Sequence, residues 1–274
     1  MADDSPDEPT TFHRFLDEAG DTTFYGSKRK VIIGEKGVSR AFYLGAVKFM
    51  CPLESARMVV EDAKRRVVSM PELNRFPSVK KRIAGGGFYF HAKDDPPPIR
   101  QLFFDELRDL SCRFEVLVAR KNATTFERLH KNNADAFYAE ILGHLLKRKL
   151  KMKGRIVLNI AQRGSSTRSV ILESALQKAR ERAQRRWPGE NLCAKVVFNV
   201  QNPRREPLLS IADYFGWAVQ RVCETGDASA YDLVRHKKHE VHDIFDGSKY
   251  RGNRNWYNPS NPLTAGNKIG PPAP

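Results

Sequence analysis

The chain has 274 residues, of which 41% are hydrophobic and 29% are charged, as is typical of a globular protein with a packed core. No apolar run approaches the roughly 20 residues that cross a membrane, and the acidic start, MADDSPDEPTTF, excludes a signal peptide, so a cytoplasmic location is expected. The net charge of +15 favours a polyanionic partner, and nucleic acid is the partner that we predict.

The first part of the chain predicts strands mixed with two helices. Residues 11–20, TFHRFLDEAG, show an alternation typical of a strand that ends at the acidic pair and Gly20. Further strands are predicted at 41–50 and, after a run of glycines, at 86–95. A helix begins after Pro52, and an amphipathic helix covers 99–110.

The second part alternates apolar strands with longer helices and closes on a short helix. Because strands alternate with helices, the chain predicts an α/β fold with a mixed sheet flanked by helices. We expect a single domain over 11–246, with flexible tails at 1–10 and 247–274. Strands are predicted at 114–121, 155–162 and 194–201, and helices at 135–151, 167–187, 207–226 and within 228–245.

An acidic pair, Asp17 and Glu18, stands where the first strand is expected to end. Carboxylates at such a position suit Mg²⁺ or Mn²⁺, and two such ions about 3.5–4 Å apart, held by three or four carboxylates, can cleave a phosphodiester. The alternative for this pair is a polar turn after a strand. Asp17 and Glu18 are therefore candidate metal ligands.

Three further acids are candidates for the same site. Asp213 lies on a predicted helix that is apolar on both sides, where a carboxylate needs a cation or a hydrogen-bond donor. Glu140, one turn before His144, borders an apolar helix face and reaches either a cleft or the surface. Asp95 closes the segment that carries His91, and helix capping is its competing role. Either histidine could assist proton transfer.

Basic residues gather near the ends of two predicted helices, in 147–153 and 178–186. They indicate a phosphate track, although a solvated helix face and the helix dipole are alternatives. In the tail, Tyr250 and Trp256 stand between cations and either stack bases or fold back on the domain. The candidate nucleic-acid-binding residues are Lys121, Lys147, Arg148, Lys149, Arg163, Arg182, Arg185 and Arg186.

Four segments, in order over most of 12–246, resemble the motifs of one family. FLDEAGD resembles YxDESGD, FHAKDDPPPIRQLFFDEL resembles FHxxxDxxxVRxxxF, LLSIADYFGWAVQRVCETGD resembles LQxADYxxWAxxRxxExGD, and ASAYDLVRHKKHEVHDIFD resembles YxxIxxKixxExDLF. These are motifs of the bacterial domain-of-unknown-function family 3800, which is grouped with ribonuclease H-like folds. The resemblance implies a metal-dependent nuclease that acts in a defence or mobile-element setting.

By this resemblance Asp17 takes the place of the first-strand carboxylate of ribonuclease H-like enzymes, and Asp213 that of the acid on the last helix. Glu140 and Asp95 are the candidates for the further catalytic acid. Two strand ends depart from the pattern, since Ala119-Arg120-Lys121 and Ala161-Gln162-Arg163 carry no acid where one is expected. The alternative to cleavage is therefore a non-catalytic nucleic-acid-binding module, or a defence-system subunit, on the same fold.

Overall fold

The computed structural model describes residues 10–162, 169–246 and 254–271. In this part of the chain the strands form one seven-stranded sheet in the order β5-β4-β1-β2-β3-β6-β7. Strand β2 runs antiparallel to both of its neighbours, β1 and β3. On the other side of β1, β4 runs parallel to β1, and β5 runs parallel to β4. The strands are β1 (Thr11–Gly20), β2 (Ala41–Phe49), β3 (Cys112–Arg120), β4 (Arg155–Ala161), β5 (Lys195–Gln201), β6 (His239–Asp243) and β7 (Trp256–Tyr257).

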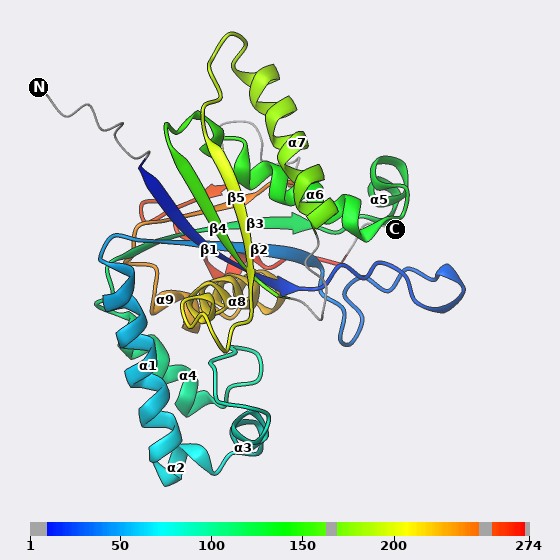
Figure 1. Ribbon diagram of the computed structural model, residues 1–274. Coiled ribbons are helices and arrows are strands. Elements are labelled where there is room, and N and C mark those ends of the chain that lie inside the picture. Colours follow the sequence, from blue (N-terminus) through cyan, green and yellow to red (C-terminus); the bar gives the residue numbers. More distant parts are fainter. Residues whose placement is uncertain (1–9, 163–168, 247–253, 272–274) are drawn as a thin grey trace, which may run out of the picture.

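Helices cover both faces of this sheet, as Figure 1 shows. Helix α8 lies against β1 and β2 on one face, and helices α6 and α7 pack together on the other. Helices α1 to α4 form an arm below the α8 face. The helices are α1 (Leu53–Ser69), α2 (Pro71–Asn74), α3 (Pro77–Ala84), α4 (Pro97–Leu107), α5 (Ala123–His130), α6 (Ala134–Leu146), α7 (Ser169–Arg186), α8 (Leu209–Thr225) and α9 (Ser229–Asp232).

The predicted α/β fold, a mixed sheet flanked by helices, is confirmed, and the sheet is consistent with the ribonuclease H-like arrangement that the resemblance implies. None of the helices in the described ranges is long and apolar enough to cross a membrane.

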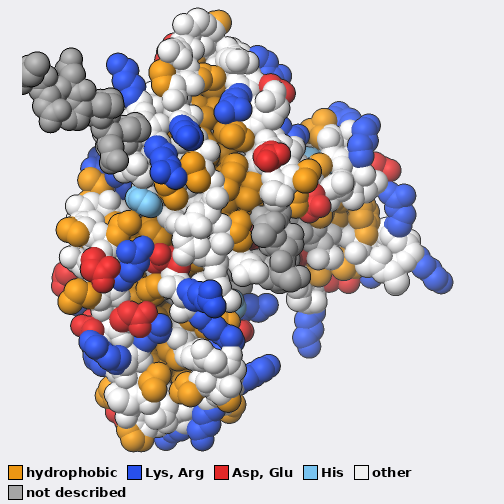
Figure 2. Space-filling view, in the orientation of Figure 1, with side chains coloured by type: hydrophobic (Ala, Val, Ile, Leu, Met, Phe, Trp, Pro, Cys, Tyr) orange, Lys and Arg blue, Asp and Glu red, His pale blue; other side chains and the backbone are white. Residues whose placement is uncertain are grey.

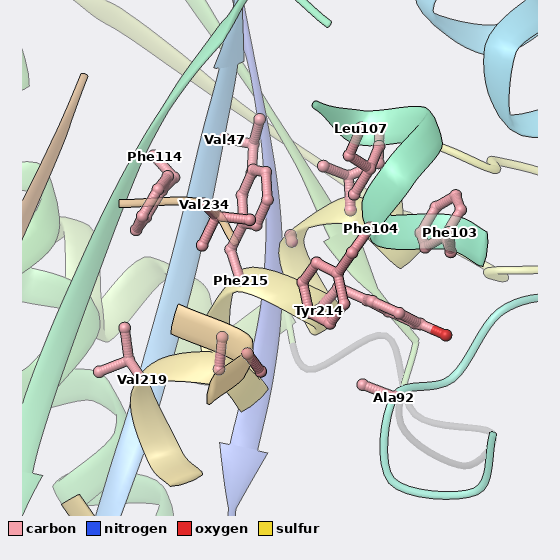
Figure 3. Close-up of a cluster of buried hydrophobic side chains, with 14 of the residues drawn as sticks. Val47, Ala92, Phe103, Phe104, Leu107, Phe114, Tyr214, Phe215, Val219 and Val234 are labelled. Atoms are coloured by element: carbon pink, nitrogen blue, oxygen red, sulfur yellow. The ribbon is translucent and has the colours of Figure 1, made fainter. Parts of the chain in front are cut away.

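The two faces of the sheet belong to two separate cores, because successive side chains of a strand point to opposite sides. On β1, Phe15 and Ala19 belong to the core under α8, whereas Leu16 belongs to the core under α6 and α7. Figure 3 shows the first core, where Phe215 of α8 lies beside Phe114 of β3, with ring centroids 4.7 Å apart. Acidic side chains can therefore approach one another only if they lie on the same face of the sheet.

Helix α8 approaches the sheet closely because Gly45 of β2 has no side chain. A Cβ atom at Gly45 would lie only 3.0 Å from the carbonyl oxygen of Ala212. Gly45 is also the cross-strand partner of Asp17. The glycine therefore allows the helix residues around Ala212 to lie directly over this stretch of β1 and β2.

The prediction of a strand at 86–95 is wrong, because these residues form loop and turns. Phe88, Phe90 and Ala92 are buried in alternation, which imitates a strand pattern. Their backbone is instead bound by side chains of α8, since the Ser210 hydroxyl donates to the carbonyl oxygen of Phe90 and Asp213 accepts from the amide of Ala92.

Two predictions near the carboxyl end also fail. Residues 239–243 were predicted to be helical, but they form β6, whose alternate side chains His239, Val241 and Asp243 are buried. The expected flexible tail does not apply to 254–271, since β7 pairs with β6 and the side chain of Ile269 is buried. The rest of the two predicted tails, apart from residue 10, lies outside the described residues.

Candidate functional site

Asp17 lines a pocket at the carboxyl ends of the parallel strands β1, β4 and β5. The pairing of β1 with β4 stops at Leu16, so Asp17 is the first residue beyond it, and its side chain is on the α8 face. The pocket has a volume of about 400 Å³. Ligand sites of open α/β sheets form at such strand ends. The lining residues are Asp17, Tyr89, His91, Ala161, Gln162, Asn202, Pro203 and Arg204.

Asp213 lies on the same side of the sheet, next to the loop that carries His91. Its side chain is 7% exposed, and Oδ2 accepts a hydrogen bond of 2.7 Å from the backbone amide of Ala92. Burial raises the pKa of Asp213 to about 6, while a charge on His91 opposes that increase. A carboxyl group in this state gains from a nearby cation, which would stabilise its charged form.

The structure thus places Asp17 and Asp213 on the same face of the sheet, and His91 is near both of them. His91 lines the pocket with Asp17, and its charge acts on Asp213. The imidazole Nδ1 of His91 lies 3.2 Å from the carboxylate of Asp94, which is largely exposed. This group of side chains is the candidate site.

Asp95 serves the structure of the loop and does not face the pocket. Its Oδ1 is paired with the Arg82 guanidinium, and its Oδ2 accepts hydrogen bonds from the Tyr214 hydroxyl and the His91 amide. The side chain of Asp95 has no exposed surface, and burial raises its pKa. Since both of its oxygens are occupied, the structure does not support Asp95 as a metal ligand.

Glu18 and Glu140 lie on the opposite side of the sheet from Asp213. Glu18 follows Asp17 in β1 and is paired in register with Leu44, which belongs to the core under α6 and α7. Glu140 of α6 forms ion pairs with Arg182 and Lys178 of α7. The structure does not bring either glutamate to Asp213.

Burial opposes the charge of Glu140, but His144 and Arg182 outweigh it and lower the pKa of this carboxyl to about 2. Glu140 is therefore the acidic centre of a contact between α6 and α7. That role explains its place at the border of the helix face.

The described residues contain no group of three or more His, Cys, Asp or Glu side chains arranged to hold a metal ion. Within the described ranges the two-metal arrangement with three or four carboxylates is accordingly not formed. A single hydrated Mg²⁺ usually keeps several waters and takes one or two carboxylates together with substrate phosphate oxygens. Asp17 and Asp213 are the two carboxylates that a site of this simpler kind would use.

The candidate basic residues separate into three groups. Lys121 is fully buried and pairs with Asp21 at 2.8 Å, so it is unavailable to a phosphate. Arg163 lies outside the described residues. The others, Lys147, Arg148, Lys149, Arg182, Arg185 and Arg186, line two neighbouring cavities on the face opposite to Asp17.

Several residues of these sites were not predicted from the sequence. Arg204 and Tyr89 line the Asp17 pocket, and Arg14, Lys48 and Arg113 line one of the basic cavities. The last three alternate with apolar residues within strands, and a search for cations at alternate strand positions would have found them. Arg204 has no comparable signal, because it depends on the path of the loop after β5.

No family model matches the chain, and no curated protein matches it either.

Proposed function

We propose that the protein is a Mg²⁺- or Mn²⁺-dependent nuclease that hydrolyses phosphodiester bonds of RNA or DNA at the Asp17 pocket. One observation carries the proposal: Asp17 lines a pocket at the strand ends while Asp213, buried and with a raised pKa, lies beside the same His91 loop. Carboxylates so placed are the oxygen ligands that these cations prefer.

Each residue of the pocket has a role in this proposal. Asp17 and Asp213 hold the cation, which when bound supplies charge neutralisation and a more acidic water. Arg204 contacts the phosphate, and the aromatic ring of Tyr89, 5.6 Å below its guanidinium, keeps it in place. His91 gives a proton to the leaving oxygen, and Asp94 orients its ring.

The overall charge supports nucleic acid as the substrate. The surplus of 15 positive charges attracts polyanions and accelerates their capture. Figure 2 shows Lys and Arg side chains spread over the sheet and over the arm of α1 to α3 on the displayed face. The positive charge that attracts a polyanion is therefore spread over the surface and not confined to the pocket.

The experiment is a cleavage assay on end-labelled single- and double-stranded RNA and DNA, with Mg²⁺, Mn²⁺ or chelator. The wild type should cleave at least one substrate only when the cation is present. Asp17→Asn and Asp213→Asn should both abolish cleavage. Glu72→Gln, which changes an exposed acid in α2, is the matched control and should cleave normally.

The second candidate is a nucleic-acid-binding module that does not cleave. Two observations favour it. Both carboxylate oxygens of Asp95 are bound, by Arg82 and by Tyr214. The ends of β3 and β4 carry Ala119 and Ala161 where acids are expected. It predicts binding that weakens with salt, is unaffected by chelator, and leaves every substrate intact.

A further inference from the structure

Two cavities join to form one groove on the face of the sheet opposite to Asp17. Their volumes are about 730 and about 540 Å³. Glu115, Arg148 and Trp256 line both of them, so the cavities are continuous. We call this joined surface the basic groove. It lies between the ends of α6 and α7 and the strands β3, β6 and β7.

The strands contribute cations to this groove because of their register. Arg14, Lys48 and Arg113 share the parity of Leu16, Leu44 and Leu117, which belong to the core under α6 and α7. The three cations follow on from that core along the same face, and all three line the groove. Asp17 has the opposite parity, so its pocket opens on the other side of the sheet.

The charge of the groove is strongly positive. Its Lys and Arg side chains outnumber the two lining glutamates, Glu115 and Glu240. Glu115 pairs with Lys149 at 2.5 Å, whereas Glu240 lies 3.8 Å from Arg148 with both side chains more than half exposed. An exposed pair of that kind contributes little. The arginines at the end of α7, Arg185 and Arg186, have no acidic side chain within ion-pair distance among the described residues.

Like charges lie close to one another in this groove. The pKa of Lys147 is lowered by burial and then by Arg148, Arg182 and Arg186. The pKa of His242 is lowered to about 3, by burial and then by His144 and Lys147 among other cations. A bound anion would relieve this repulsion, so the groove is electrostatically suited to phosphate groups.

Aromatic rings line the same groove. Trp256 of β7 stacks on His242 with centroids 3.9 Å apart, and the Arg148 guanidinium lies 4.5 Å from its centroid. Trp187, after α7, lines the other end and has Lys151 at 4.8 Å. Rings between cations are the arrangement by which proteins bind unpaired bases together with their backbone.

The close packing of α6 and α7 fixes one wall. A Cβ atom at Gly143 would lie 3.2 Å from the carbonyl oxygen of Ala175 and 2.8 Å from Nη1 of Arg182, so glycine allows the two helices to approach closely at this point. Nη1 of Arg182 and Nδ1 of His144 are buried and lack a hydrogen-bond partner in the described structure. Both atoms are buried, so a strand in the groove does not reach them.

We propose that the basic groove binds a single strand of nucleic acid, with phosphates along Lys147, Arg148, Arg185 and Arg186 and a base on the exposed part of Trp256 or Trp187. Because this groove and the Asp17 pocket are on opposite faces, the groove is a second, cation-independent binding site. It shares its partner with the proposed nuclease function but does not require cleavage. A concave surface with aromatic walls fits a polymer strand better than a flat lipid surface.

The test is fluorescence anisotropy with a labelled single-stranded oligonucleotide of about 20 nucleotides, long enough to exceed one binding site of about 4–16 nucleotides. Chelator is present throughout, so that cleavage plays no part. In low salt, Arg185→Glu combined with Arg186→Glu should raise Kd at least about tenfold, and the dependence of Kd on salt should become shallower. Trp256→Ala should raise Kd at least about fivefold. Thermal unfolding of each variant shows whether it is folded.

The matched control is Lys80→Glu combined with Lys81→Glu on α3, which changes the net charge equally but lies on the arm. It should change Kd less than about twofold, because its cations are remote from the groove. Equal weakening by both double variants would overturn the proposal, since it would show attraction to overall charge alone. Binding of the wild type to anionic phospholipid vesicles, without affinity for the oligonucleotide, would overturn it as well.

The outcomes separate this proposal from the nuclease proposal. Asp17→Asn should leave oligonucleotide affinity in chelator unchanged, whereas the Arg185 and Arg186 double variant should keep cation-dependent cleavage of a dinucleotide substrate. Loss of both properties in the double variant, with normal thermal unfolding, would contradict two separate sites.

Discussion

Oδ2 of Asp213 accepts a hydrogen bond of 2.7 Å from the backbone amide of Ala92, which connects helix α8 to the loop that carries His91. The next residue of the helix, Tyr214, binds the same loop through Asp95. Two consecutive residues of α8 therefore hold this loop in place. Asp95 and Asp213 were both predicted to be catalytic, but their environments differ. Asp95 is bound by Arg82 and Tyr214, whereas Asp213 accepts a hydrogen bond from the backbone amide of Ala92.

Asp95 is expected to contribute to stability. Asp95→Ala would leave the Arg82 guanidinium, which is 7% exposed, buried without its partner. Breaking such a buried pair costs about 3–5 kcal/mol of the free energy of unfolding. Tyr214→Phe removes only the hydroxyl and should cost about 1 kcal/mol. Urea denaturation measures both, and equal losses in the two variants would contradict the assigned role.

The raised pKa of Asp213 makes the stability depend on pH in a defined direction. The native state favours the protonated acid, so this residue costs stability as the pH rises from the unfolded pKa of 3.8 through the folded value of about 6. Asp213→Asn keeps an acceptor for the Ala92 amide and removes the cost. The variant should therefore be more stable than wild type by about 2–3 kcal/mol at pH 8, with no such advantage below pH about 4.

Urea denaturation at several pH values provides that comparison. Mg²⁺ should also raise the thermal unfolding temperature of the wild type at pH 8, because a cation bound at Asp213 stabilises the charged carboxylate of the native state. The unfolding temperature of Asp213→Asn should not change. A stability difference independent of pH would show that Asp213 is not a buried, charged group.

Lys121 is expected to stabilise the fold without binding nucleic acid. Its ammonium group donates to Asp21 at 2.8 Å and to the carbonyl oxygen of Thr23 at 3.0 Å, and burial lowers its pKa. Lys121→Met should cost about 2 kcal/mol, because Asp21 loses its partner but can still be partly hydrated. Oligonucleotide affinity, measured by anisotropy, should not change. A loss of affinity in a stably folded variant would restore Lys121 as a nucleic-acid-binding residue.

Glu140 is expected to act between α6 and α7. The pKa of its carboxyl is lowered to about 2, so its stabilising contribution is complete above the unfolded value of 4.5 and is lost as the pH falls toward 2. Glu140→Gln should reduce stability by about 2 kcal/mol at pH 7 and by roughly half as much at pH 3. Chemical denaturation at the two pH values measures this. Equal destabilisation at both would indicate a packing effect alone.

Most of the sheet was predictable, because strands such as Arg155–Ala161 are apolar runs bounded by turn signals. The segment 86–95 was not, since alternate burial of Phe88 and Phe90 arises equally in a strand and in an extended loop. The difference lies in which groups bind the backbone, and Ser210 and Asp213 lie more than a hundred residues later. In His239–Asp243 alternate residues are buried, but only Val241 among them is apolar, so no hydrophobic alternation marked a strand there.

The candidate site was predictable only in part. Asp17 could be chosen from its place in the first strand, and Asp213 from an acid on a helix that is apolar all round. The face of the sheet on which each acid lies could not be predicted, because it depends on strand register and on which helix covers which side. Glu140 and Glu18 were therefore grouped with acids that lie across the sheet from them.

Cation-dependent cleavage by three proteins side by side tests the Asp17 site most directly: wild type, Asp17→Asn and Glu140→Gln. All three are assayed with Mn²⁺, with Mg²⁺ and with chelator on the same labelled RNA and DNA strands. We expect cation-dependent cleavage by the wild type and by Glu140→Gln, and a loss of at least about 100-fold in Asp17→Asn. Cleavage by Asp17→Asn at the wild-type rate, or cleavage lost only in Glu140→Gln, would contradict the assignment of the site to the Asp17 pocket.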